Sequence, residues 1–422
     1  MNAPAPTEPA GRGRTLFLIG VLHGFTHVYH VALIPLYLAL QADLHLKNVQ
    51  EATSLVSVMM FAYFLPSYLT GMLADRVSTR ALLGWGLVIN SLGFVALSFA
   101  QSHAMAIAAV ILAGLGGSVF HPAATSLTAR LYPINTGRAF GLMAIGASLG
   151  FFVGPLYSGW RAHDAGWRAP VLELGLAGLV TAGIFFRFAA NARPRNLTQT
   201  SGPAIKLLPT WAAAGLFVAM ALGFSFRDFA GAGNATLSSL YLQKAHGDSV
   251  ESTGRVLGLI FLASALSNPL FGYLSERRRL PWAAGLLFIS AACQLMLGWA
   301  PRSLFPFNLI VFGFFLMATY PVVEAALMQA VPDAIRGRFF GLFITLGGLF
   351  GNLSHWIIGS WVQQLGPQAA DARSYSPLFA ALAVMLGLST FALLFLRRLP
   401  GIWAARPAET APSSPPLTVP KT

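Results

Sequence analysis

The segment Gly71-Met-Leu-Ala-Asp75-Arg76 recurs about 200 residues later as Gly272-Tyr-Leu-Ser-Glu276-Arg277. Each copy follows an apolar run, and each places an acidic residue beside an arginine. Three further pairs share this offset: Gly137-Arg138-Ala-Phe-Gly141-Leu142 with Gly337-Arg338-Phe-Phe-Gly341-Leu342, His121-Pro122 with Tyr320-Pro321, and Gly24-Phe25 with Gly223-Phe224. Four matching sites in the same order indicate that the chain consists of two similar halves.

The composition decides the fold class. Of the 422 residues, 10% are charged and 55% are hydrophobic, whereas a soluble protein carries roughly a quarter charged residues. Apolar runs long enough to cross a hydrocarbon core of about 30 Å as helices recur from end to end. We predict spans over 15–41, 49–73, 80–101, 104–131, 137–160, 168–190, 210–243, 254–275, 281–300, 304–331, 338–363 and 375–397. The prediction is therefore an all-α polytopic membrane protein, and a soluble enzyme, a secreted domain and a DNA-binding factor are excluded.

Twelve spans divide into two pseudo-symmetric six-helix bundles. The predicted organisation is a disordered cytoplasmic N-tail at 1–14, an N-terminal bundle at 15–190, a cytoplasmic linker at 191–209, a C-terminal bundle at 210–398 and a disordered cytoplasmic C-tail at 399–422. The first apolar run lacks a small-residue cleavage site, so we expect an uncleaved first helix.

The net charge of +13 is explained by topology. With the N-terminus inside, the inner segments hold 19 of the 27 lysines and arginines and the outer segments hold seven. Short inner loops enriched in basic residues place both termini in the cytoplasm. We therefore expect a multi-pass protein of a bacterial plasma (inner) membrane and no nucleic-acid partner. The single cysteine, Cys293, permits no internal disulfide.

The segment Gly71-x-x-x-Asp75-Arg76-x-x-x-Arg80 resembles the loop motif of the major facilitator superfamily, and a degenerate copy lies at 272–279. The resemblance covers about residues 15–398 and implies a transporter that works by alternating access. Within that superfamily the histidines of the first span and Phe120-His121-Pro122 resemble bacterial drug-efflux proteins of the fosmidomycin-resistance type.

The repeated loop segments are candidates for a conformational latch. A carboxylate at a helix end can cap a neighbouring helix and pair with arginines, which would hold the two halves together in one state. A solvated loop that only sets topology is the alternative. The latch set comprises Gly71, Asp75, Arg76, Arg80, Gly272, Glu276 and Arg277.

The fifth span carries glycines at intervals of four, namely Gly146, Gly150 and Gly154, followed by Pro155 and Gly159. Glycines four apart lie on one helix face and allow close approach of another helix, while the proline can kink the span. A similar pattern in the superfamily marks exporters, although this copy departs from it after Pro155. Ordinary tight packing explains the glycines equally well.

Three histidines of the first span, His23, His27 and His30, fall within about 60° on one helix face and about 12 to 22 Å into the membrane. Ionisable residues at that depth usually face an interior cavity, and histidine exchanges protons near neutral pH. We expect a proton-handling or cavity-lining role. Structural hydrogen bonding and metal-ion transport are alternatives; for a metal, the outer pair stands more than one turn apart and no thiolate assists.

The seventh span contains Arg227-Asp228, followed by glycines up to Asn234. This span is too long for one straight crossing, and we expect a break at 231–234 that places a substrate site at the midplane. A charge at a helix centre costs about 2.5 to 3.5 kcal/mol. Asp228 is the leading candidate proton carrier and Arg227 a candidate contact for a substrate anion, with different partners expected for the two. A structural ion pair is the alternative.

The remaining candidates complete two sets. The proton-coupling set comprises Asp228, His27, His30, His23 and Glu324. The substrate-binding set comprises Arg227, His27, Tyr29, His121, Asn234, Tyr320 and His355. For Glu324 a structural hydrogen-bond donor is an equal alternative.

Absent motifs limit the chemistry. The sequence has no phosphate-binding loop and no catalytic or metal signature. We expect no enzyme, no metal and no cofactor other than coupling protons, and a monomer that needs only lipid bilayer and a small-molecule substrate. The predicted function is proton-coupled transport of a small organic molecule, with efflux by H⁺ antiport preferred. Proton-coupled uptake of an organic anion is the alternative, followed by a metal-ion transporter and a non-transporting receptor.

Overall fold

The computed structural model describes residues 11–132, 136–190, 206–332 and 335–404. Within these ranges every regular element is a helix. The elements are α1 (Arg12–Val31), η1 (Ile34–Leu36), α2 (Tyr37–Asp43), α3 (Val49–Phe64), α4 (Ser67–Arg76), α5 (Thr79–Ser98), α6 (His103–Gly117), α7 (Phe120–Leu131), α8 (Thr136–Ala165), α9 (Arg168–Phe188), α10 (Trp211–Leu240), η2 (Tyr241–Ala245), α11 (Val250–Leu262), α12 (Ser264–Leu274), α13 (Arg279–Leu297), α14 (Phe305–Ala330), α15 (Arg336–Gln364), η3 (Gly366–Ala370), η4 (Ala372–Tyr375), α16 (Ser376–Ser389), α17 (Ala392–Arg398) and α18 (Gly401–Ala404).

Twelve segments of the described chain are long and apolar enough to cross a membrane. Each coincides with one predicted span, with ends that agree within four residues except at the C-terminal ends of the fifth and twelfth spans. The predicted all-helical, twelve-span fold is confirmed. Residues 1–10, 191–205 and 405–422, which hold most of the predicted tails and linker, lie outside the described residues. The helix α1 already begins at Arg12, and α18 continues to Ala404.

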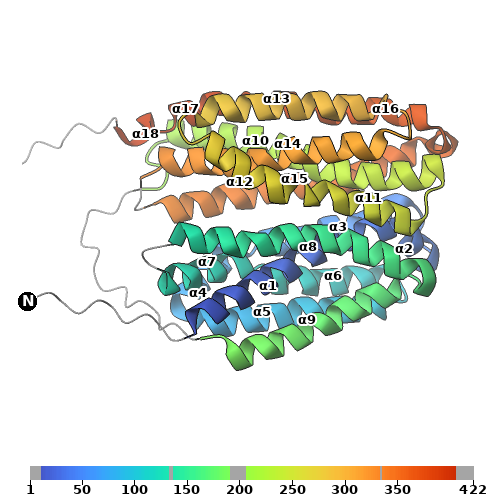
Figure 1. The fold of residues 1–422 in the computed structure, drawn as a ribbon, viewed down its shortest axis with the longest axis horizontal. Coiled ribbons are helices and arrows are strands. Elements are labelled where there is room, and N and C mark those ends of the chain that lie inside the picture. The colour runs from blue at the N-terminus through green and yellow to red at the C-terminus, as the bar shows by residue number, and fades with distance from the viewer. Residues whose placement is uncertain (1–10, 133–135, 191–205, 333–334, 405–422) are drawn as a thin grey trace, which may run out of the picture.

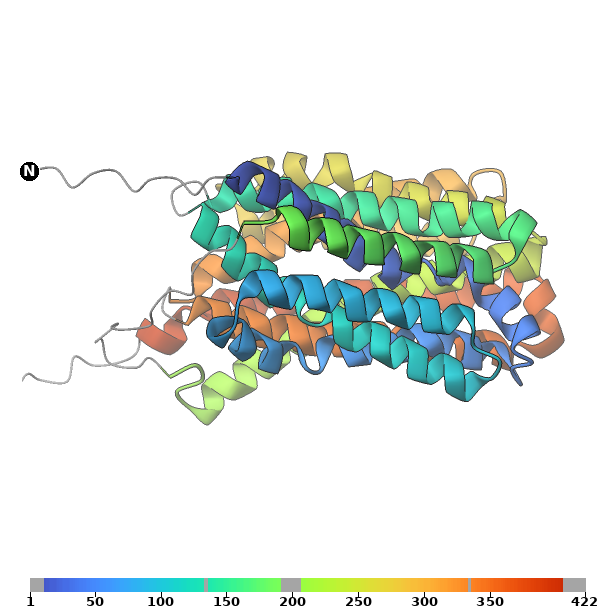
Figure 2. The same cartoon turned by 90° about the horizontal axis from the view of Figure 1, so that it is seen from below.

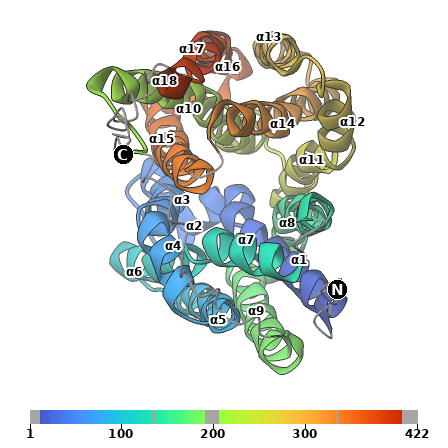
Figure 3. The same cartoon turned by 90° about the vertical axis from the view of Figure 1, so that its left-hand side faces the viewer.

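The helices run roughly along the long axis of the molecule in two perpendicular views (Figure 1, Figure 2). Seen along that axis, α1 to α9 occupy one half of the molecule and α10 to α18 the other (Figure 3). We call the end where α1 begins and α17 ends the near end. The end where α3 begins and α15 ends is the far end.

Glycines bring α8 against α1 inside the first half. A β-carbon on Gly146 would stand 1.9 Å from the Gly20 carbonyl oxygen, and one on Gly150 would stand 2.2 Å from that of Gly24. Only glycine permits such contact between two helix backbones, because any side chain would overlap the facing carbonyl. The packing fixes the position of α1, which carries three histidines, relative to α8.

The halves meet along two helix pairs, α3 with α15 and α8 with α11. At the far end a β-carbon on Gly359 would stand 2.0 Å from Thr53 Oγ1, and one on Gly159 would stand 2.9 Å from the Cα of Gly254. Apart from the adjoining backbone of their own helices, no atom of the described residues lies within 4 Å of such a carbon on the near-end glycines Gly272 and Gly341. Close packing between the halves is therefore concentrated toward the far end.

The expected break in the seventh span is wrong. The helix α10 is continuous through Gly231 and Gly233, and it changes only after Leu240, where a π-helical turn begins. The two glycines instead allow close packing: a β-carbon on Gly233 would lie 3.2 Å from the Ser354 side chain. Interruptions occur in other spans, for example at Pro35 in the first span, which lies in the short 3₁₀ segment η1.

Candidate functional site

Ionisable side chains gather in two clusters, one in each half. The histidine cluster consists of His23, His27 and His30 from α1 and His121 from α7. The charge cluster consists of Arg227 and Asp228 from α10 and Tyr320 and Glu324 from α14. His27, Asp228 and Glu324 are all partly exposed.

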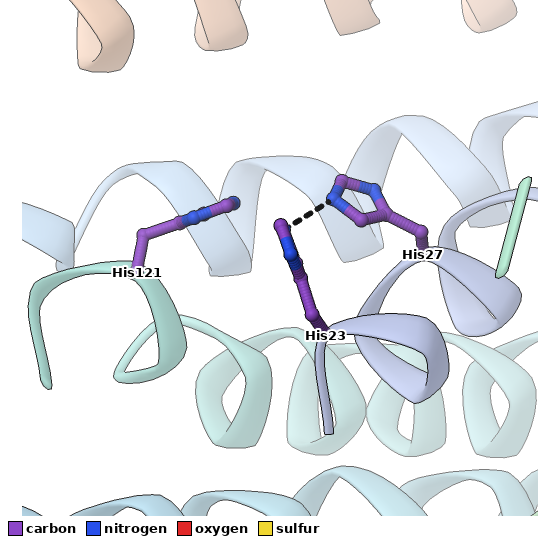
Figure 4. A group of neighbouring side chains, drawn as sticks. All are labelled: His23, His27 and His121. Carbon is purple, nitrogen blue, oxygen red and sulfur yellow. Dashed lines mark hydrogen bonds between the residues drawn. The ribbon is translucent and has the colours of Figure 1, made fainter. Parts of the chain in front are cut away.

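The hydrogen bonds of His23 and His27 define their tautomers when both rings are neutral. His23 Nδ1 lies 3.0 Å from the Met143 carbonyl oxygen of α8. Because a carbonyl only accepts, Nδ1 carries the proton and His23 Nε2 is left with a lone pair. His27 Nε2 lies 3.1 Å from His23 Nε2 and donates to it (Figure 4). His27 Nδ1 is then a buried acceptor, and no partner for it occurs among the described residues.

His121 and His30 extend the cluster in two directions. The His121 ring lies edge-on to His23, with 5.3 Å between centroids, and its side chain points toward His23 and His27 (Figure 4). The His30 ring lies edge-on to Tyr63 of α3 at 4.6 Å. Within the described chain, both His30 Nε2 and Tyr63 Oη are buried and have no hydrogen-bond partner. The cluster thus contains polar atoms that remain available for a proton or a ligand.

Arg227 is buried beneath its neighbours, with 2% of its surface exposed. Its Nε and Nη2 atoms donate to Asp228 Oδ1 at 3.0 and 2.9 Å. The guanidinium carbon lies 4.0 Å from the centre of the Tyr320 ring, a cation–π contact. The expectation of different partners for Arg227 and Asp228 is wrong, because the long arginine side chain folds back onto the adjacent carboxylate.

Helix α15 leaves space for Asp228. A β-carbon on Gly347 would stand 2.8 Å from Asp228 Oδ2, and one on Gly351 would stand 2.7 Å from Asp228 Cβ. Glu324 interacts electrostatically with both Arg227 and Asp228. With both carboxylates ionised, the charge cluster holds one positive and two negative charges.

His355 lies in neither cluster. Its Nδ1 is 2.6 Å from Thr236 Oγ1 of α10 and 3.4 Å from the hydroxyl of Tyr37 of α2, and those two hydroxyls are 3.2 Å apart. Since Tyr37 belongs to the first half, this far-end triad joins the halves. Ser239 supports the same contact by donating to the Ile34 carbonyl at 2.8 Å.

Two residues of the predicted substrate-binding set are engaged within their own half. Asn234 Nδ2 donates to Gln294 Oε1 at 2.7 Å, and Asn234 is 1% exposed. The Tyr29 hydroxyl donates to the Leu174 carbonyl at 3.0 Å and lies 2.9 Å from the Ser91 hydroxyl. These contacts support a structural role for Asn234 and Tyr29.

The predicted latch is described only in part. The side chains of Asp75 and Arg76 lie outside the described residues. Arg80 donates from Nη2 to the Phe186 carbonyl of α9, a contact inside the first half. Gly71 packs against Pro122, and Glu276 and Arg277 are exposed at the near end.

From the sequence, Tyr63 and Tyr37 are two of several aromatic residues that could line an amphipathic pocket, and no motif distinguishes them from the rest. Sequence reasoning missed the contribution of two glycines. Gly347 and Gly351 have the same spacing of four that was noted in the fifth span, and that signal could have found the surface against Asp228.

Comparison with known proteins identifies the family. The family model described as Major Facilitator Superfamily matches residues 16–227 and 220–419. Multidrug resistance protein MdtH of Aeromonas hydrophila is 34% identical over 138 residues, which cover 32% of this chain and 35% of that protein. The chain thus spans only about a third of the length of this relative.

A longer match and a solved structure agree with the family model. The fosmidomycin resistance protein of Escherichia coli is 23% identical over 343 residues, which cover 78% of this chain and 83% of that protein. The crystal structure of a bacterial homologue of the human lysosomal transporter Spinster, inward-facing and unoccupied, superposes with a TM-score of 0.73. It is 17% identical and covers 94% of this chain and 98% of its own. The chain belongs to the Major Facilitator Superfamily.

Proposed function

We propose that this protein exports a small amphipathic organic molecule in exchange for protons, by alternating access between its two halves. Membership of the superfamily supports transport, and the names of two relatives, which refer to resistance, favour export. The observation that carries the proton coupling is the charge cluster, in which one guanidinium faces two partly exposed carboxylates.

The charge cluster can exchange a proton because its three charged groups do not balance. An uncompensated charge inside a membrane protein is costly and is offset by pairing or by protonation. Arg227 neutralises one carboxylate, and Asp228 is already its hydrogen-bonded partner. One proton, on Glu324 or Asp228, makes the cluster neutral. Loss of that proton restores a net charge of −1, so the two states differ in charge at the interface with α15.

The packing between the halves supports alternating access. Hydrogen bonds from the far-end triad and from Ser239 join the halves at the far end, and the glycine contacts of Gly159 and Gly359 lie there as well. A rocking motion would have to break these contacts and form others at the near end. We propose that the near end is cytoplasmic, because basic residues are concentrated in its loops. The conformation described here would then be inward-facing.

Reconstituted protein tests the proposal. Proteoliposomes are loaded with radiolabelled fosmidomycin, chosen from the name of one relative, and its exit is followed with and without an imposed pH gradient. The proposal predicts that a proton gradient directed into the vesicles, with the outside medium more acidic, accelerates the exit of fosmidomycin at least ten-fold. Exit that does not depend on the gradient would contradict proton antiport.

One observation favours uptake of an organic anion with protons as a second candidate. Arg227 Nη1 is a buried charged donor without a partner among the described residues, and a carboxylate or phosphonate could satisfy it. A deletion strain distinguishes the candidates: greater sensitivity to toxic compounds supports export, and failure to grow on one carbon source supports uptake.

A further inference from the structure

We infer that the imidazoles of His23, His27 and His121 form a binding site for one divalent transition-metal ion of the zinc type. Each of the three rings offers a nitrogen, and these nitrogens all lie within 4.8 Å of one another. The rings converge from α1 and α7 (Figure 4). The inference concerns binding alone and does not rest on the proposed transport function.

His23 is already arranged as a metal ligand. Metal-bound histidines commonly donate their second ring N–H to a carbonyl, which fixes the tautomer and the ring orientation. His23 Nδ1 makes such a bond to the Met143 carbonyl, so its Nε2 lone pair points into the cluster. The glycine contact between Gly20 and Gly146 holds α1 and α8 together one turn from this bond.

The spacing of the nitrogens fits tetrahedral coordination. Two nitrogens bound to zinc at about 2.05 Å in a tetrahedron lie about 3.3 Å apart. His23 Nε2 and His27 Nε2 are 3.1 Å apart. The third nitrogen, on His121, needs a shift of at most about 1.5 Å to reach the same separation. His121 is partly exposed, so rotation of its side chain can supply that shift.

The hydrogen bonding of His27 is compatible with metal binding. His27 Nδ1 is a buried nitrogen without a partner among the described residues. When a metal replaces the bond between His27 and His23, the His27 proton moves from Nε2 to Nδ1 by exchange with water, and the freed Nε2 lone pair binds the metal. The ring therefore remains a neutral ligand, as metal binding requires.

The donor set determines which ion fits. Three imidazole nitrogens suit Zn²⁺, Co²⁺, Ni²⁺ and Cu²⁺, whereas Mg²⁺ and Ca²⁺ prefer oxygen ligands. Three histidine ligands leave a fourth tetrahedral position, where water or an anion can bind. Catalytic zinc sites have this combination of three protein ligands and one open position.

A direct binding experiment tests the inference. The full chain, purified with an affinity tag that contains no histidine, is titrated with Co²⁺ by visible absorption and with Zn²⁺ by calorimetry. We expect one ion per chain, the intense visible bands of four-coordinate cobalt, and no response to Mg²⁺. The variants His27→Ala and His121→Ala should each lower the affinity at least ten-fold.

His163→Ala is the matched control, because His163 is exposed at the end of α8, and it should bind as the unmodified chain does. Thermal unfolding shows whether each variant is folded, and His121→Ala decides the matter if His27→Ala does not fold. Absence of binding by the unmodified chain overturns the site. Binding by both cluster variants with unchanged affinity also overturns it, since the ion would then lie elsewhere.

Discussion

Asp228 Oδ2 lies 2.8 Å from the point where a β-carbon on Gly347 would stand. The contact connects the carboxylate beside Arg227 to α15, the helix that packs against α3 of the other half. A change of charge on Asp228 therefore acts directly on a helix at the interface between the halves.

Gly347→Ala should abolish coupled transport while the protein still folds. The added methyl group must displace the Asp228 carboxylate, at a typical overpacking cost of about 1–3 kcal/mol. We expect proton-driven export to fall at least ten-fold in proteoliposomes. Gly341→Ala lies in the same helix, and apart from the backbone of that helix no atom of the described chain lies within 4 Å of the added carbon. This variant should transport normally. Equal transport by the two variants would refute the assigned contact.

Arg227→Ala should destabilise the protein strongly. Removing one partner of a buried ion pair leaves the other charge uncompensated, at a cost of up to about 3–5 kcal/mol, less here because 19% of the Asp228 side chain is exposed. Arg161→Ala is the comparison, since its pair with Glu173 is about one-third exposed on both sides and such pairs contribute about 0–1 kcal/mol. Thermal unfolding in detergent should show the larger drop for Arg227→Ala, and a smaller drop would be evidence against a desolvated pair.

Tyr37→Phe should increase the fraction of molecules in which the two halves are separated at the far end. The substitution removes the Tyr37 hydroxyl from the far-end triad, and a hydrogen bond of about 0.5–1.5 kcal/mol corresponds to a two- to ten-fold shift in population. A reporter cysteine, Ala235→Cys in a Cys293→Ser background, measures how often the far end opens. Ala235 is only 5% exposed in the closed arrangement, so labelling requires opening. The reaction of this cysteine with an impermeant maleimide added on the far side should accelerate by the same factor as the population shift.

The control for that experiment is Tyr375→Phe. Its hydroxyl donates to the Ala369 carbonyl at 3.0 Å, a bond within the second half. The labelling rate should stay unchanged in this variant. If both tyrosine variants accelerate labelling equally, the triad has no particular role in closing the far end.

Gly359→Leu should open the far end more completely. A β-carbon on Gly359 would already stand 2.0 Å from Thr53 Oγ1 and 3.0 Å from Gln50 Cα, so a leucine cannot fit while α3 and α15 touch. Labelling of the Ala235→Cys reporter should exceed that of Tyr37→Phe. At Gly285, an added β-carbon meets no atom of the described residues within 4 Å beyond its own helix backbone, so Gly285→Leu should leave labelling at its basal rate. A closed far end in Gly359→Leu would contradict the proposed interface.

The fold could be predicted from the sequence because each span must be apolar and about 20 residues long. The face shared by His23, His27 and His30 also followed from helical geometry alone. The sequence places His121 in the same substrate-binding set as His27, but its ring contacts with His23 and His27 could not be predicted, since they depend on how α7 packs beside α1. The same limit explains the error at Gly231 and Gly233, where glycine serves close packing instead of a helix break.

The sequence left a structural ion pair between Arg227 and Asp228 as the alternative and could not decide between it and separate partners. Adjacent residues on a helix point about 100° apart, which predicted separate partners for Arg227 and Asp228. The arginine side chain is long enough to fold back, and its burial beneath Tyr320 favours the nearest carboxylate. Which carboxylate pairs with the guanidinium depends on tertiary surroundings that the local pattern does not contain.

The central claim is that the charge cluster exchanges one proton during transport, and luminal pH in proteoliposomes tests it most directly. Vesicles that contain a pH indicator are supplied with fosmidomycin, and the proton movement linked to it is recorded for the unmodified chain, Asp228→Asn and Asp164→Asn, whose carboxylate is exposed at the end of α8. In Asp228→Asn, Arg227 and Glu324 balance each other without a proton. We therefore predict proton movement in the unmodified chain and in Asp164→Asn, and at least a ten-fold smaller signal in Asp228→Asn. Full proton movement in a folded Asp228→Asn variant would contradict the account.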